Sequence, residues 1–111
     1  MSNHQITDFE TDAEFLQLIQ PRVEKYIEDL EEDIFDHGCD EAICVWGNIL
    51  IDGHLRYSIC RKWDIHFNIR RLFFQSRDEA EAYICTEQLK RKDLTSEYKK
   101  YLIGRGASGQ T

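Results

Sequence analysis

One short segment of the chain combines residue types that bind phosphate. Asp52, Gly53 and His54 directly follow the apolar residues 49–51, and Arg56 comes two positions later. A glycine between a buried strand and a helix lets the backbone approach a ligand closely, and the first free N–H groups of the helix form an anion site. Arg56 can aim its planar guanidinium at a phosphate, and Asp52 can orient it or help hold a metal. The pattern predicts a phosphate site; the alternatives are a plain strand-to-helix connection and a capping or packing role for His54.

The cysteines offer a second type of chemistry. The chain has four, Cys39, Cys44, Cys60 and Cys85, and no two of them form a C-x-x-C pair. We interpret them as reduced thiols that act as small core or surface residues. The alternative is a zinc site at His37, Cys39 and Cys44, although two of the three spacings in that cluster fit no common zinc motif.

Basic residues that could contact a polyanion gather in the second half of the chain. Residues 1–60 carry 14 acidic and 3 basic side chains, whereas residues 61–111 carry 7 acidic and 11 basic ones. The first half should repel nucleic acid, so DNA should meet residues beyond Lys62. The candidates for DNA contact are Arg70, Arg71, Lys90, Arg91 and Lys92. The alternative is that these are solvated charges, with the basic run at 90–92 stabilising the end of a helix.

Length and composition indicate one globular domain. The 111 residues carry a net charge of -7, are 41% hydrophobic and include a single proline. This composition argues against disorder, and no apolar run approaches the ~18 residues of a membrane span. The N-terminus shows no secretion signal, so we expect a cytoplasmic protein that does not bind membranes. We predict a single domain over residues 1–111, with its core at about 20–103 and a flexible tail at 104–111.

Helical periodicity predicts the elements that begin the chain. Thr11 or Asp12 can cap a short helix that ends near residue 19, and Pro21 suits an early position of the next helix. That second helix should run to Asp36 and stop at Gly38. Its apolar residues recur at spacings of three and four and predict one buried stripe. The stripe consists of Val23, Tyr26, Ile27, Leu30, Ile34 and Phe35.

A hairpin and further helices should follow. Residues 43–46 and 49–51 are typical of two strands joined by a tight turn at residues 47–48, and a helix is expected over 54–62. Residues 66–74 predict another strand, with a bulge at Arg70-Arg71. Ser76 with Glu79 forms a capping box for a helix to about residue 89. Thr95 should start the last helix.

Three segments of the chain together resemble a known family, the ParB N-terminal domain, also called the ParB-like nuclease or ParB/sulfiredoxin superfamily. Residues 38–45 stand in the place of its first motif. Residues 53–56, Gly-His-Leu-Arg, match the second motif in a form common in mobile elements, and residues 87–96 match the third. Their order and spacing agree with the family, so the resemblance covers roughly residues 30–103.

The resemblance implies a fold and a ligand. The expected fold is α/β (α+β), with a small mixed β-sheet flanked by helices. In this family the second and third motifs hold a nucleoside triphosphate, which is CTP in partition ParB and ATP in sulfiredoxin. Carried over by position, Gly53, His54 and Arg56 would face the phosphates, and Glu87 would help bind Mg²⁺. His54 stands where sulfiredoxin has its catalytic cysteine, which excludes peroxiredoxin repair.

The leading functional hypothesis is a nucleotide-responsive binding module that acts with DNA in partition or regulation of a plasmid, phage or other mobile element. One alternative is a metal-dependent nuclease or nucleotidase, in which Asp52 and His54 would be catalytic and Glu87 would hold a metal. Another is a degenerate module for protein interaction. Only one helix follows the basic run, so we expect DNA to be bound weakly, or through a partner or a missing domain. A homodimer would also fit this hypothesis.

Overall fold

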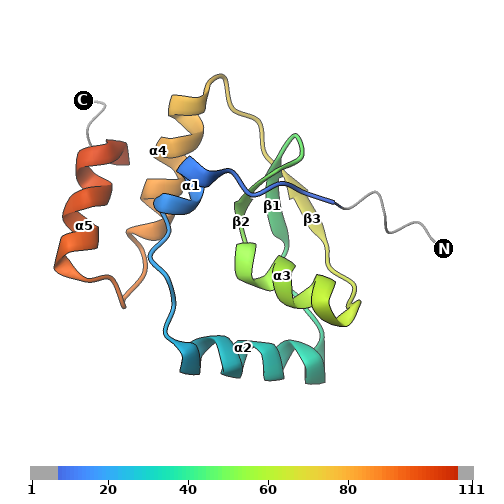
Figure 1. Cartoon of the computed structure of the whole chain (residues 1–111). Helices are drawn as coiled ribbons and strands as arrows, with labels where there is room; N and C mark the ends of the chain where they lie inside the picture. Colours follow the sequence, from blue (N-terminus) through green and yellow to red (C-terminus); the bar gives the residue numbers. More distant parts are fainter. Residues whose placement is uncertain (1–7, 108–111) are drawn as a thin grey trace. The chain divides into compact units, whose positions relative to one another are not determined.

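The computed structural model describes residues 8–107, which divide into two compact units. The first unit contains residues 22–72 and the segment before Asp12, and the second contains residues 12–21 and the chain from Phe73 onward. Helices and a small mixed sheet make this an α+β fold (Figure 1), as predicted. No helix in residues 8–107 is long and apolar enough to cross a membrane.

The sheet belongs to the first unit and has the strand order β2-β1-β3. Strands β1 (Ile43–Trp46) and β2 (Ile49–Asp52) are antiparallel and joined by the predicted turn, where Gly47 has a φ of 61°. Strand β3 (Ile69–Arg71) runs parallel to β1 on its other side. The sheet is therefore mixed, as expected.

Strand β3 is shorter than the predicted strand over residues 66–74. Its pairing with β1 is bounded by two backbone hydrogen bonds, from Ile43 N–H to the Asn68 carbonyl and from Leu72 N–H to the Val45 carbonyl, each 2.8 Å long. Three of the four residues of β1 pair with β3, from Ile43 to Val45. The bulge predicted at Arg70-Arg71 was also wrong: the irregularity lies in the other pair of strands, between Cys44 and Val45 of β1.

Helices α2 (Glu24–His37) and α3 (His54–Trp63) pack together in the same unit (Figure 1). Helix α2 ends at Gly38, as predicted, where φ is 83°. It begins later than predicted, because Val23 is extended and acts as the N-cap, so Pro21 lies outside the helix. The predicted apolar stripe is confirmed only in part: Ile34 is buried and Leu30 packs against its cluster, but Val23, Tyr26 and Phe35 are exposed.

Two apolar clusters hold the first unit together. Ile34 packs with Cys39, Ile59 and Cys60, in a cluster formed by α2, α3 and the segment after α2. Ile43, Val45 and Leu50 of the sheet form the other cluster, and partly buried residues pack against it. Those residues are Phe9, Tyr57, Phe67 and Ile69. Large buried side chains of this kind supply most of the stability of a small domain.

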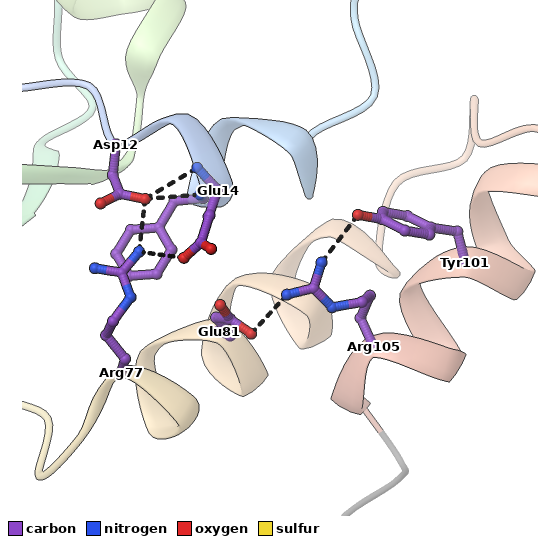
Figure 2. A network of polar contacts seen from close by, with 7 residues as sticks. Asp12, Glu14, Arg77, Glu81, Tyr101 and Arg105 are labelled. Carbon is purple, nitrogen blue, oxygen red and sulfur yellow. Dashed lines mark hydrogen bonds and ion pairs between the residues drawn. The ribbon is translucent and has the colours of Figure 1, made fainter.

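The second unit contains helices α1 (Ala13–Gln17), α4 (Arg77–Gln88) and α5 (Ser96–Leu102). Figure 2 shows how charged side chains join α1 to α4. Asp12 caps α1 through its carboxylate and also accepts a hydrogen bond of 2.7 Å from Arg77, which is 2.9 Å from Glu14. The pKa of the Asp12 carboxyl lies below its usual value, mainly because of the hydrogen bond from Arg77.

The predicted caps of the later helices are confirmed. The hydroxyl of Ser76 accepts from the N–H of Glu79 at 3.2 Å, and that of Thr95 accepts from the N–H of Tyr98 at 3.0 Å. The predicted capping box is incomplete. The carboxylate of Glu79 accepts from the N–H of Gln75, whereas a capping box would use the N–H of Ser76.

The last helix extends further than predicted. The chain continues after α5 into η2 (Ile103–Ala107), in which Gly106 departs from helical geometry with a φ of 153°; the prediction assigned residues from 104 onward to a tail. Arg105 holds this segment to α4 and α5, because its guanidinium lies 2.9 Å from the Glu81 carboxylate and 3.0 Å from the Tyr101 hydroxyl (Figure 2). The rest of the predicted tail, residues 108–111, lies outside the described residues.

All four cysteines are free and buried, which confirms their interpretation as reduced thiols. Burial raises the pKa of the Cys60 thiol to about 12, with the neighbouring Cys39 as a further cause. Thiols that stay protonated in this way are poor nucleophiles and poor metal ligands.

Candidate anion-binding site

Gly53 connects β2 to α3 in a conformation that few other residues adopt. Its φ is 99° and its ψ is 25°, and it is the N-cap of α3 without a side chain to cap the first turn. A Cβ at this position would lie 3.0 Å from Ile43 Cδ1 and 3.2 Å from an Nη atom of Arg56. Both the backbone angle and the available space therefore require glycine. Because no side chain caps the helix, its first N–H groups are available to an anion.

Arg56 lies against this glycine, one turn into α3. Its Nη1 is 3.0 Å from the Oε1 of Glu41, whose side chain is 76% exposed, whereas that of Arg56 is only 21% exposed. The Nε of Arg56 is buried and has no hydrogen-bond partner among the described residues. One edge of the guanidinium therefore pairs with a solvated carboxylate, and a further donor is left without a partner.

His54 adds two more polar atoms of this kind. Both ring nitrogens are buried without a hydrogen-bond partner in the described part of the chain. Burial lowers the pKa of His54 below its usual value, and the negative charge of Asp52 opposes this only in part. Most buried polar atoms in proteins are hydrogen-bonded. Three unsatisfied atoms within three consecutive residues therefore indicate that a ligand or water completes this turn.

Asp52 is the last residue of β2, so it lies at the same turn as His54. The nuclease alternative needs these two residues together with a metal. Among residues 8–107, no group of three or more His, Cys, Asp or Glu side chains is placed to hold a metal ion. This also applies to the cluster around His37, Cys39 and Cys44.

Glu87, the predicted ligand of magnesium, belongs to the second unit. It lies on α4 and pairs with Lys90 through a contact of 2.9 Å. Its carboxylate would have to leave this surface ion pair in order to bind a cation. Its proposed role remains a prediction.

The five predicted DNA contacts have different surroundings. Arg70 and Arg71 are exposed on β3, and Lys92 is exposed as well. Lys90 is exposed but pairs with Glu87. Arg91 is a poor candidate for DNA contact, because its side chain is only 8% exposed. Its guanidinium donates to Asp93, Gln88 and the carbonyl of Gln20.

Sequence reasoning missed Glu41 as a partner of Arg56. The two residues are 15 positions apart, and Glu41 precedes β1 whereas Arg56 follows β2. Only the antiparallel pairing of these strands brings the two side chains together. No local signal in the sequence marks this pair.

Comparison with known proteins finds a solved structure that is similar to this chain. No family model matches the chain, and no curated protein matches it. A solved structure of a Pnob8-like ParB-N domain is similar over 90% of this chain, with a TM-score of 0.70 and 26% sequence identity. The match covers 41% of the other protein's chain, so this chain spans about two fifths of it. This similarity shows that the chain has the fold of a ParB N-terminal-like domain.

Proposed function

We propose that this chain is a nucleotide-responsive binding module, related to DNA partition, that acts in the maintenance or regulation of a plasmid, phage or other mobile element. The ParB-N-like fold supports the relation to partition. The observation that carries nucleotide binding is the turn at Gly53, where an uncapped helix start adjoins three buried polar atoms without partners, two of His54 and one of Arg56.

The residues present suit a triphosphate. The N–H groups at the start of α3 can donate to phosphate oxygens, and Gly53 keeps the space beside them free of a Cβ. Arg56 can add charge-assisted hydrogen bonds, and His54 can donate one more. From the resemblance to the family, we also propose Glu87 on α4 as a ligand of Mg²⁺. The base, whether of CTP or ATP, is left for experiment.

The role in DNA binding is proposed to be secondary. The exposed residues Arg70, Arg71, Lys90 and Lys92 would give weak, sequence-independent association at low salt, because the net charge of -7 opposes approach to DNA. Sequence-specific binding would need a partner or a further domain. No specific observation favours the nuclease, since the described residues hold no donor cluster around Asp52 and His54.

A thermal-shift panel tests the nucleotide proposal. The chain is heated with CTP, ATP, GTP or UTP, each with Mg²⁺, and with sulfate as a simple anion. A nucleotide present at a hundred times its dissociation constant should stabilise the fold by about 2.7 kcal/mol. No shift with any of these ligands would contradict the proposal and favour the protein-interaction module.

A plasmid cleavage assay with Mg²⁺ or Mn²⁺ separates the binding module from the enzyme. We expect intact DNA under conditions where a nucleotide still raises the melting temperature. Metal-dependent cleavage that is lost in Asp52→Asn would establish the nuclease instead.

A further inference from the structure

Two large aromatic side chains contact each other on the surface of the first unit. Phe35 of α2 is 61% exposed and Trp63 at the end of α3 is 44% exposed. Their rings meet edge to face, with centroids 5.2 Å apart and an angle of 70° between the planes. Single exposed apolar residues are common, but an exposed aromatic pair concentrates the side chains that dominate protein interfaces.

The indole of Trp63 is held in place by three neighbours. Its Nε1–H donates to the carboxylate of Glu31. The ammonium group of Lys62 lies 5.1 Å from the indole centroid and also pairs with Glu31 at 2.9 Å. Phe35 contacts the ring from the side. A side chain that is already fixed loses little entropy when a partner covers it, so Trp63 is preorganised for binding.

The surface beside this pair is acidic. Helix α2 contains seven carboxylates against the basic residues Lys25 and His37. Glu24, Glu28 and Glu31 precede Phe35 by eleven, seven and four residues, a spacing that places them on one face of a helix. Glu31 is used to fix Trp63, but Glu24 and Glu28 are exposed and form no ion pair with any residue in the described range.

We propose that this α2–α3 surface, defined by Phe35 and Trp63 with Glu24 and Glu28, binds a basic amphipathic segment of a partner protein. An aliphatic or aromatic side chain of the partner would cover the two rings. Lysine or arginine side chains on the same segment would face Glu24 and Glu28. The charge of α2 selects this class of partner, because complementary potentials speed association and like charges exclude nucleic acid and acidic proteins.

Selection from a random peptide library, displayed at a length that allows four helical turns, tests the proposal on the full chain. We expect the enriched peptides to carry net positive charge together with apolar residues. The double variant Phe35→Ala/Glu28→Lys should weaken their binding at least about tenfold, as loss of an interface anchor does. These residues are exposed, so the variant should fold, and circular dichroism with thermal unfolding verifies this.

Matched controls keep the test specific. Phe73→Ala removes another exposed phenylalanine, and Asp33→Lys makes the same charge change as Glu28→Lys on another face of α2. Both should bind the peptides as the wild type does. Enrichment of acidic or uncharged peptides, equal loss of binding in the controls, or no enrichment would overturn the proposal. Self-association in sedimentation velocity that Phe35→Ala abolishes would also overturn it, since a second copy would then occupy the surface.

Discussion

Arg91 and Arg56 are both largely buried, yet their surroundings differ in a way that separates structure from function. The guanidinium of Arg91 makes a bidentate contact with Asp93 at 2.7 and 2.9 Å and donates at 2.8 Å to both Gln88 and the carbonyl of Gln20. Arg56 pairs with the exposed Glu41, and its Nε has no partner in the described residues. An arginine that uses nearly all of its donors within its own unit stabilises that unit, whereas one with a buried, unused donor can serve a ligand.

Replacing Arg91 should have the largest effect on stability. Arg91→Ala would leave the Gln88 side chain and the Gln20 carbonyl without their donor. We expect the free energy of unfolding to fall by about 2–4 kcal/mol, since removing one member of a buried polar network costs this much. Denaturant unfolding measures the change. A loss no larger than that in Lys92→Ala would remove the distinction between the two arginines.

Gly53→Ala should cause the next largest loss of stability. The positive φ and the contact with Ile43 should together cost about 1–3 kcal/mol. Gly47→Ala is the control, because Gly47 also has a positive φ but nothing lies within 4 Å of its hypothetical Cβ. Gly53→Ala should destabilise the chain more than this control and should also weaken binding of triphosphate. Equal destabilisation and unchanged ligand binding would leave the glycine with a role in backbone conformation alone.

Stability should depend on pH through His54. Burial depresses its pKa in the folded state, so the unfolded chain takes up the proton first as the pH falls. The contribution of this histidine should be complete above a pH of about 6.5 and decrease as the pH drops below that value. His54→Gln should therefore reduce the loss of stability between neutral and mildly acidic pH, measured by denaturant unfolding. A similar loss of stability in the wild type and in His54→Gln would contradict this prediction.

Arg56→Lys should change the free energy of unfolding of the ligand-free chain by less than ~1 kcal/mol. The reason is that the carboxylate of Glu41, the ion-pair partner of Arg56, is largely exposed. It should nevertheless remove most of the melting shift caused by triphosphate or sulfate, since lysine cannot reproduce the planar fork of arginine. Arg70→Lys, on the exposed edge of the sheet, is the control. An unaltered ligand shift in Arg56→Lys would end the assignment of this residue to the phosphate site.

Glu41→Gln should have the smallest effect on the stability of the ligand-free chain. In contrast to Arg56→Lys, it should strengthen anion binding. Glu41 holds one edge of the Arg56 guanidinium, so it competes with an incoming anion. Removing its charge should raise the affinity for sulfate and triphosphate about two- to fivefold, the equivalent of one exposed ion pair. Titration calorimetry measures this change, with Asp40→Asn as the control for net charge. Equal affinities in the two variants would show that Glu41 does not compete.

Features encoded within a few residues could be predicted from the sequence. The caps Asp12, Ser76 and Thr95, the turn at residues 47–48 and the start of α3 after Gly53 all depend on local chemistry, and the structure confirms them. The residues proposed for the phosphates are also adjacent in sequence, which is why they could be identified together.

Features that depend on tertiary contacts could not be predicted. Periodicity showed that α2 has apolar residues at helical spacing, but not that only Ile34 among them would be buried and Phe35 left exposed. Alternating residues suggested a long last strand, although only three of its residues pair with β1. One of the hydrogen bonds of Arg91 goes to the carbonyl of Gln20, which is 71 residues away in the sequence.

The sheet of the first unit also bears on aggregation. A strand with an unpaired edge can recruit a strand from another molecule, and short or charged edges prevent this. On one side, β3 has only three residues, and two of them are the exposed Arg70 and Arg71. On the other side, Glu10 bridges to Ile49, accepting from Leu50 N–H at 2.9 Å and donating to the Asn48 carbonyl at 2.7 Å. Both borders of the sheet thus discourage edge-to-edge assembly, so Arg70 and Arg71 would help keep the chain free of fibrous aggregates even where no DNA is present.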